Sequence, residues 1–511
     1  MSKALLKSTG IVSAMTSLSR VTGFIRDMVY AQMFGAGAGT DAFFVAFRIP
    51  NLLRRLFAEG AFSQAFVPVF SEYQARHSHA ELEELVDQVA GTLGALLLLV
   101  TAIGVVAAPV LILLFAPGFT ADANQYDLTV EMLRITFPYL FFISLTAFAG
   151  GVLNSCGKFA VPAVTPVLLN LTMIAAALWL APRMEQPVMG LAWGVFIAGV
   201  IQLSFQVPFL RQVKLLPRPR WGWAARGVQQ ILRLMLPALF GSSVAQINLL
   251  LNTVLASFLV SGSVSWLYYS DRLVEFPLGI FGVALGTVIL PKLSRQHADA
   301  ETEGFSQTLD WALRWALLIG VPATVALIIL SGPILSALFQ YGAFDARDVI
   351  MSAYSLMAFT LGLIAFMLIK VLAPGFYARK DIRSPVKYGL IAVGANTVLV
   401  LILVWPLAHT GLALATSLAA LLNAGLLFIN LRRRHIYQPR AGWGKFLAQL
   451  TAANLAMGLV LWFGAGNLEQ WLTASARDRL WHLSGLIAAG GGTYLLAALA
   501  VGIRPRQLLH E

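Results

Sequence analysis

The two most N-terminal apolar stretches of the chain carry five arginines: Arg20, Arg26, Arg48, Arg54 and Arg55. A cationic side chain at the centre of a bilayer costs roughly 2.5–3.5 kcal/mol even on lenient insertion scales. The nearby carboxylates, Asp27, Asp41 and Glu59, are too few to neutralise them all. These side chains are therefore predicted to face an internal, water-containing cavity, and a cationic cavity suits an anion.

The composition identifies a polytopic membrane protein, because 58% of the residues are hydrophobic and only 12% are charged. Soluble domains carry about 25% charged residues. Apolar stretches of about 20 residues cross a bilayer as helices, and about fourteen such spans are predicted. Their approximate ranges are 8–33, 41–59, 86–115, 128–153, 161–181, 188–210, 228–259, 264–290, 309–339, 349–375, 386–405, 410–431, 444–465 and 480–502.

The distribution of Lys and Arg predicts the orientation. With an even number of spans and the N-terminus inside, most of the cations that lie outside spans fall in cytoplasmic segments, the block Arg432, Arg433 and Arg434 among them. Both termini are therefore expected to be cytoplasmic. The net charge of +12 is explained mostly by this bias, so it does not indicate a nucleic-acid partner.

The chain matches itself at an offset of about 224 residues. The aligned pairs are Arg48 with Arg272, Pro68 with Pro291, Pro109 with Pro333, and Pro162 with Pro385. Each repeat would hold six helices, so both copies would have the same orientation and be related by a pseudo-two-fold axis along the membrane normal. Chance similarity among apolar helices is the alternative.

This repeat predicts an N-terminal lobe over 1–226, a C-terminal lobe over 227–440, and an additional helix pair over 441–511. In such two-lobed carriers the substrate binds between the lobes.

Polar faces recur in both predicted lobes. Asp41, Arg48 and Arg55 are seven residues apart and share one stripe of a helix. In the second lobe, Ser265 and Arg272 lie on one face with Tyr268 and Glu275. Arginine donates bidentate hydrogen bonds to phosphate, so several arginines would enclose a diphosphate. The alternative is that these arginines pair with acids and only lock helices together.

Motifs for catalysis are absent from the sequence. It contains no HExxH, GxSxG or Walker motif, and the histidines are scattered. We therefore predict no catalytic residues, no bound metal and no cofactor. The segment 61–73 has the pattern of an amphipathic helix lying on the cytoplasmic membrane surface.

Four segments resemble the MurJ/MviN family of bacterial lipid II flippases, over essentially the full chain. They are "SLSRVTGFIRD", "GTDAFFVAFRIPNLLRRLFAEGAFSQAFVPVFSEY", "SVSWLYYSDRLVEFPLGIFGVALGTVILP" and "VLAPGFYARKDIRSPVK". The resemblance implies a fourteen-helix fold, a central cationic cavity, and a groove for the polyprenyl tail on the last helix pair. It also implies membership of a superfamily that holds drug exporters and polysaccharide-unit flippases.

The resemblance also implies roles for individual residues. Arg20, Arg26, Arg54 and Arg272 match the required cavity arginines of the family, and Asp41 matches its required acid. Arg55, Glu59 and Ser265 match less decisive cavity positions. Together with Arg48, these residues are the predicted substrate-binding set.

The function that follows is transport of lipid II from the cytoplasmic to the outer leaflet of the bacterial inner membrane by alternating access. Membrane lipids and the cell-wall synthesis machinery are the other expected partners, and membrane potential or an ion gradient is the expected energy source. Two alternatives stay open. One is a flippase or exporter of another undecaprenyl-diphosphate-linked sugar, and the other is a membrane enzyme or scaffold acting on such lipids.

Overall fold

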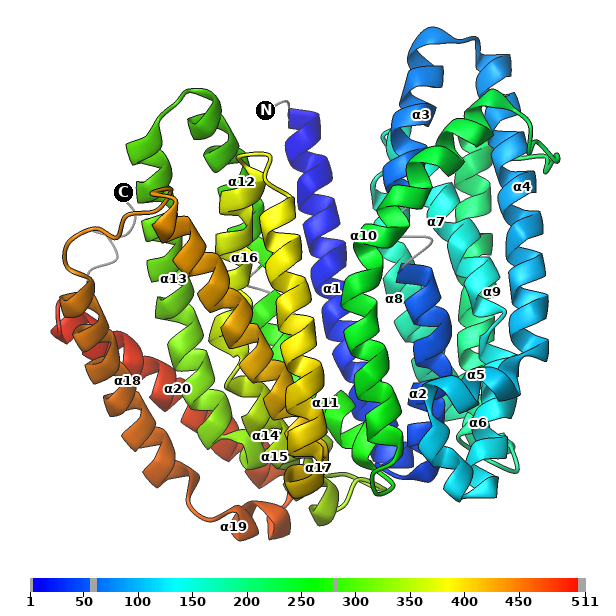
Figure 1. Cartoon of the computed structure of the whole chain (residues 1–511). Helices are drawn as coiled ribbons and strands as arrows, with labels where there is room; N and C mark the ends of the chain where they lie inside the picture. Colours follow the sequence, from blue (N-terminus) through cyan, green and yellow to red (C-terminus); the bar gives the residue numbers. More distant parts are fainter. Residues whose placement is uncertain (1–2, 56–61, 280–282, 504–511) are drawn as a thin grey trace. The chain divides into compact units, whose positions relative to one another are not determined.

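The computed structural model describes residues 3–55, 62–279 and 283–503, without the side chains of residues 3–9, 236–245, 247 and 283–287. The described ranges are helical and contain no strand (Figure 1), which confirms the predicted all-α class. The chain forms two compact units, which we call unit 1 (Met1–Val264) and unit 2 (Ser265–Glu511).

Unit 1 holds the helices α1 to α10 and three short helical turns. These are α1 (Lys3–Phe34), α2 (Ala38–Arg54), α3 (Ser63–Arg76), α4 (His79–Val106), α5 (Ala108–Phe115), η2 (Pro117–Ala121), α6 (Ala123–Thr136), α7 (Tyr139–Ser155), α8 (Ala160–Ala175), η3 (Ala176–Leu180), η4 (Ala181–Arg183), α9 (Met189–Gln212) and α10 (Arg226–Ser257).

Unit 2 holds the remaining helices. These are α11 (Ser263–Pro277), which begins at the unit boundary, α12 (Val283–Ala298), α13 (Thr302–Ile329), α14 (Ser331–Phe339), α15 (Ala346–Thr360), α16 (Leu363–Tyr377), α17 (Arg383–Arg433), α18 (Trp443–Ala465), α19 (Leu468–Thr473) and α20 (Ala476–Ala500).

The compact units do not follow the borders that the repeat predicts. Helix α10 packs against α3, α4 and η2, so it belongs to unit 1. The C-terminal helices α18 and α20 pack against α13 and α14, and therefore belong to unit 2. The three predicted segments, 1–226, 227–440 and 441–511, stay a prediction about the transport fold.

Within the described residues, nine helices are long and apolar enough to cross a membrane. The arginine-bearing helices α1, α2 and α11 are not among these nine. Helices α2 and α11 have only 17 and 15 residues, and α1 is long enough but carries polar and charged residues. Each predicted span falls on helical segments where the chain is described. The number of about fourteen spans stays a prediction.

Helix α17 combines two predicted spans. Its 51 residues would extend about 77 Å as one straight helix, far more than the ~30 Å hydrocarbon core. The backbone breaks at Ala408, where φ is 48° and ψ is −131°. A Cβ on Gly411 would lie 2.2 Å from the carbonyl oxygen of Leu403, so the chain turns back closely on itself. The break separates the predicted spans 386–405 and 410–431.

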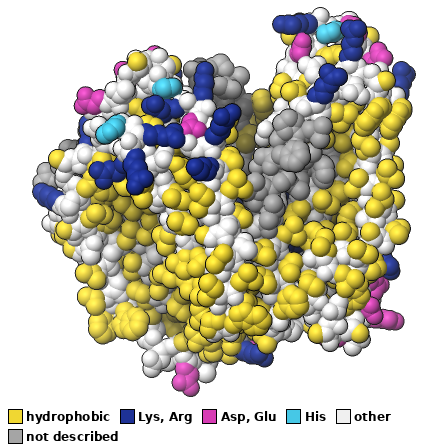
Figure 2. All heavy atoms as spheres, in the orientation of Figure 1, with side chains coloured by type: hydrophobic (Ala, Val, Ile, Leu, Met, Phe, Trp, Pro, Cys, Tyr) yellow, Lys and Arg dark blue, Asp and Glu magenta, His cyan; other side chains and the backbone are white. Residues whose placement is uncertain are grey.

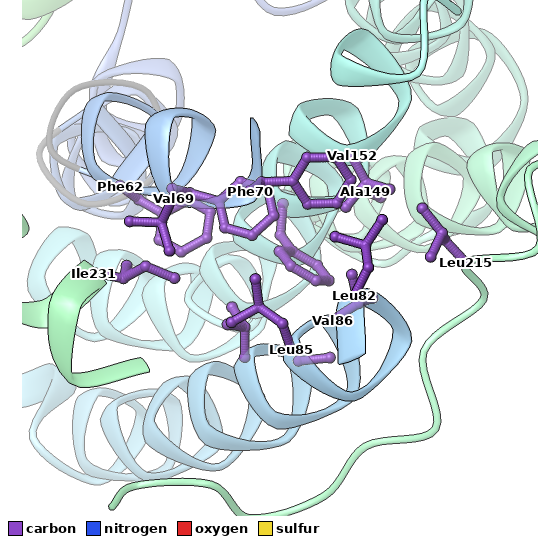
Figure 3. Close-up of a cluster of buried hydrophobic side chains, with 14 of the residues drawn as sticks. Phe62, Val69, Phe70, Leu82, Leu85, Val86, Ala149, Val152, Leu215 and Ile231 are labelled. Carbon is purple, nitrogen blue, oxygen red and sulfur yellow. The ribbon is translucent and has the colours of Figure 1, made fainter. Parts of the chain in front are cut away.

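The apolar face of α3 lies inside unit 1. Phe66 and Phe70 are completely buried, and Phe66 packs against Phe148 of α7 with the ring centres 5.2 Å apart. Figure 3 shows this cluster, in which α3 side chains meet those of α4, α7 and α10. The prediction that 61–73 lies on the membrane surface is therefore wrong for this face, since protein and not lipid covers it.

In unit 2, a buried carboxylate on α13 fastens the segment that leads into α18. Asp310 Oδ1 accepts hydrogen bonds from Tyr437 Oη and Trp443 Nε1, both at 2.7 Å, and its Oδ2 lies 2.9 Å from Arg314 Nε. The Arg314 guanidinium also lies 5.3 Å from the Trp443 ring centre. The carboxylate is completely buried and its charge is compensated, so this node anchors the C-terminal helices to α13.

Replacing Asp310 by alanine should destabilise unit 2 strongly, because it leaves Arg314 without its carboxylate partner in a buried site. Removing one member of a buried ion pair costs about 3–5 kcal/mol. Thermal unfolding of the purified protein in detergent measures the effect, and Asp299→Ala, which removes an exposed acid near the start of α13, is the control. Equal unfolding temperatures for the two variants would contradict the anchoring role.

The loop between α16 and α17 should give the stability a dependence on pH. The Ser384 hydroxyl donates to Asp381 at 2.6 Å and Arg434 donates to it at 2.8 Å. The Ser384 side chain, followed by its backbone amide and Arg434, lowers the pKa of Asp381 below its ordinary value. This carboxylate therefore stabilises the fold above its unfolded pKa of about 4, and the contribution disappears as the pH falls through the lower folded pKa.

Asp381→Asn should lower the unfolding temperature at pH 6 and reduce its dependence on pH below about 4. Unfolding temperatures of the variant and of the unchanged protein, measured across this range, check the prediction. Parallel curves for the two proteins would show that this carboxylate is not responsible.

Candidate functional site

Arg26 on α1 is buried against α8, with 7% of its surface exposed. Its Nε and Nη2 donate to Asp27 Oδ1 at 3.0 and 2.7 Å, and its Nη1 donates to Asn170 Oδ1 at 3.0 Å. The guanidinium also lies 5.5 Å from the ring centre of Tyr30. The adjacent carboxylate compensates the buried positive charge.

Asn170 completes this link between α1 and α8. Its Nδ2 donates to the carbonyl oxygen of Ser19 at 2.9 Å, and a Cβ on Gly23 would lie 3.3 Å from the same nitrogen. The glycine thus gives α8 room to approach α1, and the amide holds both helices and the arginine in one arrangement.

Asp41, at the start of α2, is 2% exposed. Its Oδ2 accepts a hydrogen bond of 2.7 Å from the backbone amide of Gly262, in the turn that follows α10. Gly262 has φ of 98°, in the region that favours glycine. A carboxylate acceptor makes this a strong hydrogen bond, so Asp41 holds the turn after α10 against α2.

Arg48, seven residues after Asp41 on α2, contacts α10 itself. Its Nη1 donates to the Thr253 hydroxyl of α10 at 2.8 Å. The hydroxyl in turn donates to the Leu249 carbonyl oxygen at 2.7 Å. Arg48 and Asp41 therefore join α2 to α10 and to the turn that follows it.

The other predicted residues of unit 1 differ in accessibility. Arg20 on α1 is half-buried, and Arg55 at the end of α2 is exposed. Arg54 is half-buried and its Nε donates to Asn51 Oδ1 at 3.0 Å. Glu59 lies outside the described residues.

In unit 2, Arg272 on α11 is half-buried. Its Nη1 lies 2.8 Å from Glu275 Oε2, its Nη2 donates to the Tyr268 hydroxyl at 3.3 Å, and its guanidinium lies 5.0 Å from the Tyr268 ring centre. These partners lie three and four residues away, on the face that the spacing predicts. Ser265, on the same helix, is completely buried.

The predicted residues thus fall into two kinds. Arg26, Asp41 and Arg48 bind side chains or backbone of neighbouring helices in unit 1. Arg20, Arg54 and Arg272 are half-buried, as Arg48 is, and Arg55 is exposed. The hydrogen bonds described above for Arg54 and Arg272 are to residues of their own helices. A single cavity that gathers all of them stays a prediction, as does their binding of substrate.

Three of these partners were not among the residues predicted from the sequence: Asn170, Thr253 and Gly262. Asn170 had a usable signal, because an amide in the apolar span 161–181 needs a hydrogen-bond partner. Thr253 and Gly262 had no such signal. A threonine hydroxyl commonly donates to a carbonyl oxygen of its own helix, and glycine occurs in many turns.

No group of three or more His, Cys, Asp or Glu side chains that could hold a metal ion occurs among the described residues.

Comparison with known proteins gives one consistent family. The chain matches the family model described as lipid II flippase MurJ over residues 30–480. A probable lipid II flippase MurJ of Vibrio cholerae is 49% identical over 99% of this chain and 98% of its own length. The lipid II flippase MurJ of Burkholderia cenocepacia is 46% identical over 92% of both chains.

Solved structures agree. A lipid II flippase MurJ in an inward closed conformation has a TM-score of 0.81 at 28% identity, and the match covers 95% of this chain and 97% of that chain. An inward-facing multidrug resistance transporter of the MATE family and MOP superfamily has a TM-score of 0.68 at 16% identity, over 85% and 98% of the two chains. This second likeness concerns the fold alone.

Asp41→Ala should loosen the turn after α10, because Gly262 loses its carboxylate acceptor. A hydrogen bond to a charged group contributes about 1.5–3 kcal/mol, so local opening at this amide should become at least about tenfold more frequent. Hydrogen exchange of the segment around Gly262 measures the change. Asp127→Ala, at an exposed position of α6, is the matched control. Unchanged exchange in Asp41→Ala would show that the turn does not depend on this bond.

Proposed function

Because this chain belongs to the lipid II flippase MurJ family, we propose that it moves lipid II from the inner to the outer leaflet of the cytoplasmic membrane. The family is one of transporters, so the chain is not an enzyme. It is a multi-pass protein of the bacterial inner membrane. As part of the proposal, both termini lie in the cytoplasm, as the distribution of Lys and Arg predicts.

The observation that carries the binding mechanism is the exposure of arginine at the end of α2. Arg55 is exposed and Arg54 is half-buried, and both lie in the predicted span 41–59. A guanidinium facing acyl chains would cost roughly 2.5–3.5 kcal/mol or more. In this proposal Arg54 and Arg55 therefore face water until substrate binds, and a phosphate group then replaces that water.

Lipid II offers a diphosphate with several acceptor oxygens and about two negative charges. We assign direct contact with it to Arg20, Arg54, Arg55 and Arg272. In this assignment Glu275 and Tyr268 orient Arg272 before substrate arrives. Arginine suits the task better than lysine because its planar fork donates two parallel hydrogen bonds and its charge persists in any environment.

Arg26, Asp41 and Arg48 have a different role in this proposal. Their polar atoms hold α1 to α8, and α2 to α10 and its turn. In this proposal they position the more accessible arginines. Replacing one of them would displace the arginines that contact the diphosphate without removing any of those arginines.

Transport by alternating access remains part of the proposal, with the headgroup in the polar interior and the polyprenyl tail in lipid or along α18 and α20. A ligand shifts a conformational equilibrium only by binding one state more tightly. Net direction must therefore come from membrane potential, an ion gradient, or removal of the product by the cell-wall synthesis machinery. We propose no cofactor.

Arg54→Ala and Arg272→Ala should each abolish growth in a strain depleted of its own flippase, while the protein still inserts into the membrane. Reconstituted in vesicles with fluorescent lipid II, each variant should exchange lipid between leaflets at least about tenfold more slowly, because a bidentate charged contact is lost. Lysine at either position should restore part of the rate if charge matters more than geometry.

Arg433→Ala is the matched control, since it removes an exposed guanidinium at the end of α17. Normal transport by both alanine variants would refute the diphosphate role. Another polyprenyl-diphosphate-linked sugar presents the same diphosphate, so a parallel assay with such a lipid decides between the two substrates. Failure of the unchanged protein to move either lipid would refute transport itself.

A further inference from the structure

The connection between α9 and α10, residues 213–225, lies along the N-terminal half of α4, and we call it the strap. The backbone amide of Arg218 donates to Asp87 Oδ1 at 2.7 Å, and the amide of Arg220 donates to the Asp87 carbonyl oxygen at 3.0 Å. The amide of Gly222 donates to the Thr92 hydroxyl at 3.1 Å. Three successive hydrogen bonds therefore fix the strap on the helix.

Two glycines allow this close contact. A Cβ on Gly91 of α4 would lie 2.2 Å from the carbonyl oxygen of Arg220, and a Cβ on Gly222 would lie 2.5 Å from Cβ of Gln88. The backbone of the strap thus rests directly on α4. The side chains that it carries are presented from a defined position.

A cavity of about 470 Å³ opens between the strap, the start of α4 and the end of α9. Its walls carry charges of opposite sign. The carboxylates of Glu83, Glu84 and Asp87 come from α4. The cations come from α9, which supplies Arg211, and from the strap, which supplies Lys214 and Arg218.

The carboxylates and the cations that line the cavity do not fully compensate one another. Asp87 is occupied by the strap, since it accepts from the Arg218 amide and lies 3.9 Å from Arg220 Nε. Glu84 accepts from Gln88 Nε2 at 2.8 Å and Glu83 lies 3.2 Å from His79 Nε2, both exposed contacts on α4 itself. The cavity therefore offers a cationic wall and an acidic wall to one ligand.

The cavity lies where the apolar surface of unit 1 ends. Leu98 and Ile103 of α4 and Ile197 and Ile201 of α9 are exposed large apolar side chains farther along the same two helices. Figure 2 shows basic, acidic and histidine side chains gathered at the α3 end of unit 1, with apolar side chains below them.

Two tryptophans of the strap mark the same boundary. Trp221 and Trp223 are exposed, and their rings stack with centres 6.1 Å apart and an angle of 10° between planes. Exposed tryptophan is typical of the membrane–water interface, where its ring sits at headgroup level. A molecule with its polar group in the cavity could thus extend acyl chains over α4 and α9.

We propose that this cavity binds the phosphoethanolamine headgroup of a phospholipid. Arg211, Lys214 and Arg218 bind the phosphate, and Glu83 and Glu84 accept hydrogen bonds from the primary ammonium. A purely anionic headgroup would use only the cationic wall and meet two carboxylates on the other. The volume is in the usual range of ligand pockets, about 300–1,000 Å³. The site is independent of the diphosphate arginines.

The test compares lipids bound to the full-length protein, purified in detergent, by native mass spectrometry. The probes are dioleoyl phosphatidylethanolamine, phosphatidylglycerol, which lacks the ammonium, and phosphatidylcholine, whose ammonium cannot donate a hydrogen bond. The unchanged protein should bind phosphatidylethanolamine about tenfold more tightly than the other two, since charge-assisted hydrogen bonds are gained at both walls.

The double substitution Arg211→Ala with Arg218→Ala should lower phosphatidylethanolamine binding about tenfold, and Arg433→Ala should leave it unchanged. Glu84→Gln keeps the shape of the acidic wall and should remove the preference for phosphatidylethanolamine over phosphatidylglycerol. This conservative variant serves as the test if the double variant does not fold.

Equal binding of phosphatidylglycerol by the unchanged protein would show a cationic patch and overturn the proposal. Equal binding of phosphatidylcholine would do the same by excluding the acidic wall. A double variant that folds and binds phosphatidylethanolamine as Arg433→Ala does would place the lipid elsewhere on the protein. None of these results bears on lipid II transport.

Discussion

A guanidinium in a membrane protein needs either a compensating partner or water, and the arrangement of both units follows from this requirement. Arg26 meets it through Asp27 and Asn170, and Arg314 meets it through Asp310 and the face of Trp443. Arg26 is buried and Arg314 is half-buried, and each of them joins neighbouring parts of the fold. The arginines at the end of α2 and on α11 keep part of their surface accessible, and we assign them to substrate binding.

Polar contacts also organise the helices that are least suited to lipid. α1, α2 and α11 carry the predicted arginines and are not among the nine apolar spans found in the described residues. In unit 1, α1 is tied to α8 by Arg26, and α2 is tied to α10 by Arg48. A few hydrogen bonds between specific atoms therefore join α1 and α2 to their neighbours in unit 1.

The sequence predicts most of what depends on composition and periodicity. The all-helical membrane class follows from the apolar fraction, and the shared face of Tyr268, Arg272 and Glu275 follows from their spacing on one helix. Contacts between distant helices were beyond reach, because nothing in a single sequence relates Asp41 to Gly262 or Arg48 to Thr253. Lipid was expected to cover the apolar face of 61–73 because an amphipathic pattern is the same whether lipid or protein covers that face, and here α4 and α7 cover Phe66 and Phe70.

The Asp310 node bears on how far the C-terminus can be shortened. The segment before α18 supplies the Tyr437 hydroxyl, and the first residue of α18 supplies the Trp443 indole, to one buried carboxylate of α13. A protein ending before this segment would lose both hydrogen-bond donors, and the Trp443 ring would no longer cover the Arg314 guanidinium. The final helices thus cannot be removed without cost. A gene truncated upstream of them would encode a protein in which Asp310 and Arg314 lose the aromatic side chains that cover them and become accessible to water or lipid.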